Sequence, residues 1–147
     1  MASNAFKHWE QYLSAEDFLD LTDYIDNITY RIPNDKMIIL YGTGGNGKST
    51  LMCEIESYLG DELCGQQECR FNELLFEENI KPLILLHDGT IDWTHKNYKS
   101  NRDLSNSIAN LTRYGVSFIA AVNRIEIVNQ KIINNSRIIT MTHYFYH

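Results

Sequence analysis

The sequence predicts an α/β domain with a mainly parallel central sheet and helices on both faces. Short apolar runs alternate with stretches of helical periodicity, and a glycine-rich loop joins the first apolar run to the next helix. Strands of a parallel sheet are buried on both faces and are therefore continuous apolar runs, while the helices between them cover the sheet. With 147 residues, the chain is long enough for one such domain with its own core.

The apolar runs of the chain are the expected strands. They cover residues 37–41, 83–86, 116–122 and 137–142, and a further short strand is expected at 68–71. Pro82 introduces the fully apolar run at 83–86, which is the best candidate for a central strand.

Helical patterns precede and separate these runs. Ser14 is the expected N-cap of a helix with Asp17 in its first turn, and apolar residues then recur at three- and four-residue spacing. These apolar residues are Phe18, Leu21, Ile25 and Ile28. Further helices are expected at 50–59, 72–79 and 103–114. We therefore expect an N-terminal helical segment at 1–35 and a single compact core at 36–147.

The loop after the first strand carries a phosphate-binding pattern, G-x-x-x-x-G-K-[ST]. Its residues are Gly42, Thr43, Gly44, Gly45, Asn46, Gly47, Lys48, Ser49 and Thr50. The glycines let the backbone N–H groups surround an anion, and the following helix presents its positive N-terminal end to it. Lys48 then reaches the β- and γ-phosphates, and the Ser49 hydroxyl ligates Mg²⁺. The sequence therefore predicts a site for ATP as substrate, with Mg²⁺.

Three residues near strand ends match the further needs of nucleotide hydrolysis, namely a carboxylate, a polar group that orients water, and positive charge. Asp88 follows the run at 83–86 and His87, and is the expected carboxylate and a second Mg²⁺ ligand. Asn123 ends the next apolar run, where its amide can bond the γ-phosphate and the attacking water. Arg137 precedes the last strand and is the candidate arginine finger for a neighbouring subunit. Taken singly, each residue also fits a plain structural role.

Charge is unevenly distributed along a chain whose net charge is −6. Residues 1–35 hold seven acids and two bases, whereas residues 90–147 hold three acids and seven bases. Basic and aromatic side chains interleave at 93–102, which predicts either a loop that contacts single-stranded nucleic acid or a solvated polar loop.

Membrane and secretory classes are excluded by the sequence pattern. No apolar run approaches the roughly 20 residues that a membrane-spanning helix needs, and the N-terminus lacks the apolar core of a signal peptide. The odd number of cysteines suits a reducing, intracellular setting.

The order of these features resembles the superfamily 3 helicases of viruses and of plasmid and phage primases. The resemblance consists of Asn46 before Gly-Lys-Ser, a Walker B strand, a basic segment, an apolar strand that ends in Asn123, and Arg137 before a final strand. It covers about residues 14–145 and implies an AAA+-like P-loop NTPase, a three-layer sandwich with N-terminal helices. It departs from the family at His87-Asp88, where two adjacent acids are usual, and this departure weakens the case for vigorous hydrolysis.

The resemblance implies an ATP-driven motor that forms a homo-oligomeric ring on single-stranded DNA, with RNA also open, in the host cytoplasm or nucleus. ATP would lie between subunits, with Lys48, Ser49, Asp88 and Asn123 from one subunit and Arg137 from the next. Three alternatives share the P-loop: a small-molecule or nucleotide kinase, another P-loop ATPase such as a packaging type, and a nucleotide-binding assembly protein with weak turnover.

Overall fold

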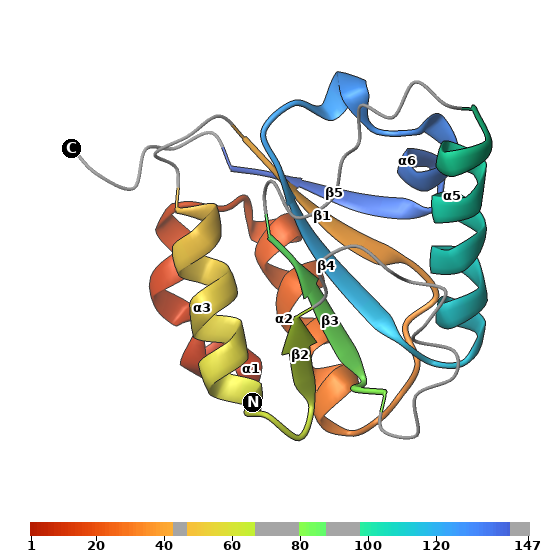
Figure 1. Cartoon of the computed structure of the whole chain (residues 1–147). Helices are drawn as coiled ribbons and strands as arrows, with labels where there is room; N and C mark the ends of the chain where they lie inside the picture. Colours follow the sequence, from red (N-terminus) through yellow and green to blue (C-terminus); the bar gives the residue numbers. More distant parts are fainter. Residues whose placement is uncertain (43–46, 67–79, 88–97, 142–147) are drawn as a thin grey trace.

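Five strands in the described part of the chain form one sheet in the order β2–β3–β4–β1–β5, with each observed pairing parallel (Figure 1). The strands are β1 Met37–Tyr41, β2 Cys64–Gln66, β3 Leu83–Leu86, β4 Ser117–Val122 and β5 Ser136–Thr140. The computed structural model describes residues 1–42, 47–66, 80–87 and 98–141, with backbone alone at 66 and 98–104.

Helices cover both faces of this sheet (Figure 1). They are α1 Ala2–Ala5, the 3-10 helix η1 Lys7–Gln11, α2 Ala15–Thr29, α3 Lys48–Leu59, α5 Tyr98–Arg113, the 3-10 helix η2 Ile125–Ile127 and α6 Gln130–Asn134. One core cluster joins α1, η1, α2 and α3 to one face, and a second joins α5 and α6 to the other. The predicted three-layer α/β architecture is confirmed. Within the described ranges, no helix combines the length and apolarity that crossing a bilayer requires.

Strand β1 shows why the apolar runs predict buried strands. Ile38 and Leu40 belong to the cluster under α2 and α3, whereas Met37 and Ile39 belong to the cluster under α5 and α6. Successive side chains of a strand point to opposite faces, so a strand covered on both sides must be apolar at every position. The four apolar runs are strands in the structure, and the run at 83–86 lies inside the sheet, between β2 and β4.

Several helices and strands could not be predicted from the sequence, because their segments are polar or short. Helix α5 begins at Tyr98 rather than at residue 103, so the interpretation of 93–102 as a loop is wrong for its last five residues. Strand β2 and helix α6 are too short for their sequences to show a recognisable strand or helix periodicity. The expected strand at 68–71 and helix at 72–79 lie outside the described residues.

The N-terminal helices share a core with the sheet. The Ser14 hydroxyl caps α2 as predicted, accepting a 3.1 Å hydrogen bond from the Asp17 amide. Trp9 of η1 is fully buried and donates its indole N–H to Glu54 of α3, and His8 Nε2 lies 2.9 Å from the same carboxylate. The segment before β1 is therefore attached to the helix that follows the phosphate-binding loop.

Helix α2 ends in a turn that usually contains glycine. The Ile32 amide donates to the Asn27 carbonyl at 2.7 Å and the Arg31 amide to the Ile28 carbonyl at 3.1 Å, which is the hydrogen-bond pattern of a Schellman motif. Arg31 holds the left-handed position with φ of +57°. A side chain at this position costs about 1 kcal/mol relative to glycine, because its Cβ approaches the following carbonyl.

A buried polar network joins α2 to the start of β4. The Tyr24 hydroxyl lies 3.1 Å from both backbone groups of Phe118, accepting from the amide and donating to the carbonyl. The Asn34 side-chain amide donates to the Tyr24 carbonyl at 3.3 Å and to the Ser117 hydroxyl at 3.0 Å. Burial raises the pKa of Tyr24, so the hydroxyl stays protonated and keeps its donor.

Replacing Tyr24 by Phe tests this network. We expect Tyr24→Phe to lower the free energy of unfolding by about 1–3 kcal/mol, because the Phe118 amide and carbonyl lose a buried partner. Urea unfolding measures the change. The matched control is Tyr30→Phe at a tyrosine that is 67% exposed, which should change stability by no more than about 0.5 kcal/mol. Equal stabilities for the two variants would contradict the structural role of the Tyr24 hydroxyl.

Candidate nucleotide-binding site

The phosphate-binding loop begins at the carboxyl edge of the sheet, between β1 and β4. Gly42 follows β1 directly, is buried, and donates its amide to the Val122 carbonyl at 3.2 Å. In open α/β sheets, ligands bind in the crevice outside the carboxyl ends of the strands. Thr43, Gly44, Gly45 and Asn46 lie outside the described residues, so the structure defines the two ends of the loop.

Lys48 is held at the mouth of this loop. Its side chain is only 6% exposed, and its Nζ donates to the Gly42 carbonyl at 2.5 Å. A buried ammonium group requires hydrogen-bond acceptors or a counter-charge. Gly47, at φ of +87°, precedes it in a left-handed conformation that glycine adopts without strain. The loop therefore places a positive charge beside its own first residue, where an entering phosphate can replace the carbonyl as its partner.

The first turn of α3 provides the remaining donors. This helix has 12 residues, and among the described residues no side chain caps its N-terminus at Gly47. The N–H groups of an uncapped first turn favour an anion, and the helix dipole adds to this preference. Ser49 is exposed and Thr50 half-buried in this turn. The exposed Ser49 hydroxyl fits the oxygen ligand that Mg²⁺ takes beside a bound phosphate.

Asn123 lies beside the loop. It directly follows Val122, whose carbonyl accepts the Gly42 amide, and its side chain is half-buried. The structure therefore brings the end of β4 to the start of the phosphate-binding loop, an arrangement that the sequence order alone does not specify.

His87 also lies at the carboxyl edge of the sheet, but one strand further from the phosphate-binding loop than Asn123. It follows β3, which pairs with β4 on the side opposite to β1. It is half-buried directly after β3, and the predicted carboxylate Asp88 lies outside the described residues. No group of three His, Cys, Asp or Glu side chains in the described ranges is arranged to hold a metal ion. The metal-ligand role of Asp88 therefore stays a prediction.

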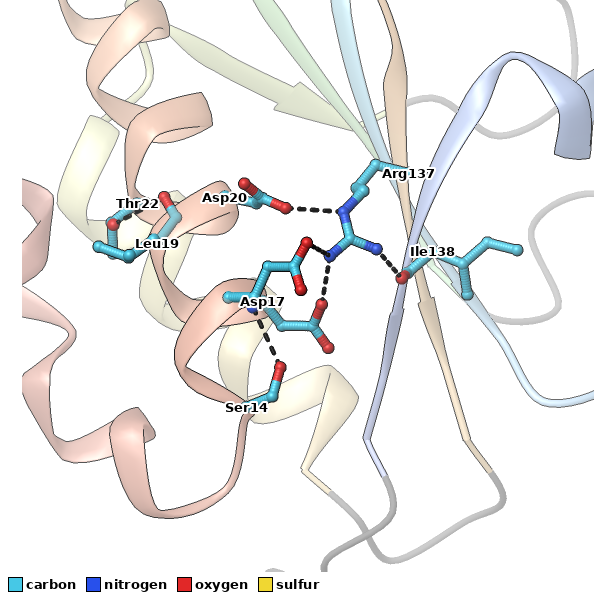
Figure 2. A network of polar contacts seen from close by, with 8 residues as sticks. Ser14, Asp17, Leu19, Asp20, Thr22, Arg137 and Ile138 are labelled. Carbon is cyan, nitrogen blue, oxygen red and sulfur yellow. Dashed lines mark hydrogen bonds and ion pairs between the residues drawn. The ribbon is translucent and has the colours of Figure 1, made fainter.

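Arg137 lies on β5, the edge strand beside β1, and its side chain bonds to helix α2 (Figure 2). It aligns with Ile38 near the start of β1, whereas the phosphate-binding loop follows the end of that strand. Its guanidinium bonds Asp17 at 2.6 Å and Asp20 at 2.7 Å, and donates to the Ile138 carbonyl at 3.0 Å. The hydrogen bond that Arg137 donates to Asp20 raises the pKa of Arg137, so its guanidinium stays charged.

This ion-pair network was missed by sequence reasoning. Asp17 and Asp20 are one helical turn apart on α2, and this spacing is the one signal that two acids share a face. The side chain of Arg137 remains 38% exposed, although that of Asp17 is only 14% exposed. The structure thus does not bring Arg137 to the loop of its own chain, and leaves part of the guanidinium accessible from outside.

No family model and no curated protein sequence matches the chain. Solved structures of AAA+ ATPases resemble it. A Trip13 structure from Rhizobiales matches with a TM-score of 0.60 and 12% identity, covering 96% of this chain and 66% of that one. A C. elegans PCH-2 structure matches with a TM-score of 0.58 and 13% identity, over 90% and 44% of the two chains.

A RuvB variant from Thermotoga maritima matches with a TM-score of 0.57 and 15% identity, over 94% of this chain and 48% of that chain. These likenesses show that the chain has the α/β fold of a P-loop NTPase. The chain spans between 44% and 66% of the length of the three structures.

Ligand-dependent stability tests the site without requiring turnover. We expect Mg²⁺ and ATP at about 100 times the dissociation constant to stabilise the wild type by about 2.7 kcal/mol, because the nucleotide binds the folded state alone. Lys48→Met should lose most of this gain, since it removes the cation that faces the phosphates. Thermal unfolding with and without nucleotide measures both. Lys7→Met, at an exposed lysine of η1, is the control and should keep the full gain.

Proposed function

We propose that this protein is an ATP-binding and hydrolysing motor of the superfamily 3 helicase type, which acts on single-stranded nucleic acid in viral or mobile-element replication. The observation that carries the proposal is the arrangement at the β1–α3 junction. Lys48 is buried against the Gly42 carbonyl, at the N-terminus of an uncapped helix, and Asn123 follows the residue that bonds Gly42. The AAA+ P-loop ATPase fold supports it.

ATP binding uses the groups at the two ends of the loop. The loop amides and the first turn of α3 hold the phosphates, and Lys48 exchanges the Gly42 carbonyl for their oxygens. Ser49 and Asp88 would hold Mg²⁺, which would supply positive charge to the nucleotide phosphates. These interactions position the γ-phosphate without forming a bond to the protein.

Hydrolysis adds a polar group and a second cation. In the proposed reaction the Asn123 amide holds the attacking water, and its position after β4, at the carboxyl edge, supports this role. Arg137 meets the γ-phosphate of a neighbouring subunit in a homo-oligomeric ring. In this account the guanidinium leaves Asp17 and Asp20 when a subunit docks, and its exposed part makes the first contact.

A second candidate is a nucleotide-binding assembly protein with weak turnover. The observation that favours it is His87, which stands before Asp88 where the helicases carry a further acid. An imidazole is a poorer Mg²⁺ ligand than a carboxylate, because Mg²⁺ prefers oxygen ligands. In this candidate the chain binds ATP to assemble and hydrolyses it slowly.

The ATPase rate with and without single-stranded DNA tests the motor. We expect the strand to raise turnover of the wild type, because strand and nucleotide bind the same assembled form. Lys48→Ala should abolish turnover with and without the strand. Hydrolysis that ignores DNA and RNA but accelerates with a small acceptor would instead indicate a kinase. ATP binding without measurable turnover would support the assembly protein.

Subunit mixing tests the role of Arg137. We expect Arg137→Ala to lower turnover by about 10³-fold or more while ATP still binds, because the loss affects the transition state. Mixing it with Asp88→Ala subunits should restore part of the activity, since some interfaces then hold one intact copy of each residue.

The double variant Asp17→Asn, Asp20→Asn is the matched control for that experiment. It removes the two shortest ion pairs of Arg137 but keeps the guanidinium, so turnover should persist. If this control loses activity as fully as Arg137→Ala, and mixing gives no rescue, Arg137 serves the fold and has no role at a neighbouring site.

A further inference from the structure

A cavity lies at the amino edge of the sheet, away from the phosphate-binding loop. Its volume is about 290 Å³, and its walls come from the end of α2 and from the segments before β3 and β4. Arg31 and Pro33 line the cavity from the end of α2. Lys81 and Pro82 line it from the segment before β3, and Tyr114 from the segment before β4. Parallel strands begin at one edge and end at the other, so this cavity and the nucleotide site occupy opposite edges.

The cavity combines cations with an exposed aromatic ring. Tyr114 is 78% exposed, which is unusual for a large aromatic side chain. Arg31 is exposed and Lys81 half-buried. Neither cation forms an ion pair with a carboxylate in the part of the chain that the structure describes. Free positive charge beside an exposed ring is the combination that binds phosphates and stacks on bases.

A second cavity lies at the same edge of the sheet, near the start of β1. It has a volume of about 310 Å³ and is lined by Arg113, the residue next to Tyr114, together with Lys131 and Asp35. The two cavities thus hold four cations and one acid between them, whereas the whole chain has 13 bases and 19 acids. Positive charge in two cavities along one edge fits an extended polyanion better than a single small anion.

Backbone strain supports a function for Arg31. It occupies the left-handed position of the turn after α2, with φ of +57°, where glycine would be unstrained. A residue that keeps a side chain against such strain is a candidate for a functional role. Here the side chain that is kept is a cation on the wall of the cavity.

We propose that the amino-edge surface, defined as Arg31, Lys81, Arg113, Tyr114 and Lys131, binds single-stranded nucleic acid. The cations contact its phosphates and Tyr114 stacks on a base. The inference deepens the proposed function and rests on it for the identity of the strand, since it names where on this chain that strand binds. Nucleotide and strand would then occupy opposite edges of one sheet.

Fluorescence anisotropy of a labelled oligothymidylate tests the surface in the absence of ATP. We expect Arg31→Gly and Lys81→Gln each to weaken binding and to reduce the salt slope of the affinity by about 0.7, because each removes one phosphate contact to a single strand. Tyr114→Ala should weaken binding about five-fold or more through lost stacking. The control is Lys7→Gln, at an exposed lysine outside both cavities, which should bind like the wild type.

Urea unfolding of Arg31→Gly separates binding from folding. Because glycine relieves the left-handed strain, the midpoint should rise while affinity for the strand falls. A fall in the midpoint would show that the Arg31 side chain serves the fold, and would overturn the inference.

Different results would contradict the proposed motor function and the proposed role of the amino-edge surface. If the variants of the surface weaken binding, the surface stands even when no strand stimulates ATP hydrolysis. If strands stimulate hydrolysis equally in the wild type and all variants, the motor stands and the surface is overturned. Absence of oligothymidylate binding by the wild type also overturns it, as does tighter binding of labelled polyglutamate, which would assign the surface to an acidic protein segment.

Discussion

The parallel pairing of β1 with β4 and β5 is the constraint on which the rest of the structure depends. Because the three strands run in one direction, their ends form two chemically different edges. The carboxyl edge collects Gly42, Lys48 and Asn123, and one hydrogen bond from Gly42 to the Val122 carbonyl fixes the loop to β4. The amino edge collects the turns before the strands and the cations in them. The common strand direction thus places the phosphate-binding loop and these turns at opposite edges of the sheet.

An ion-pair network joins helix α2 to the edge strand β5. Asp17 and Asp20 of α2 hold Arg137 of β5, an edge strand that pairs with β1 alone. An ion pair that is partly exposed contributes up to about 1 kcal/mol, and the three partners of this guanidinium make it a network. A network of that strength holds an arginine in place and still lets it exchange partners.

Sequence reasoning located the buried strands closely and the polar elements poorly, for one physical reason. Apolar residues at every position of 37–41 have no role other than a doubly covered strand, so pattern and structure agree. The first turns of α5 are polar and carry no periodic apolar face, so their sequence predicts a loop. Strand β2 has three residues, and its existence depends on pairing with β3 rather than on its own pattern.

The sequence by itself determined the nucleotide-phosphate pattern, the apolar strands and the Ser14 cap, because each depends on residues close together in the chain. Only the tertiary structure decided which distant groups meet. Arg137 bonds carboxylates that precede it by 117 and 120 positions, and Tyr24 meets a strand that follows it by 94. Arg31, Lys81 and Tyr114 share one cavity for the same reason. Such contacts arise when helices pack on a sheet, and no local pattern encodes which side chains that packing brings together.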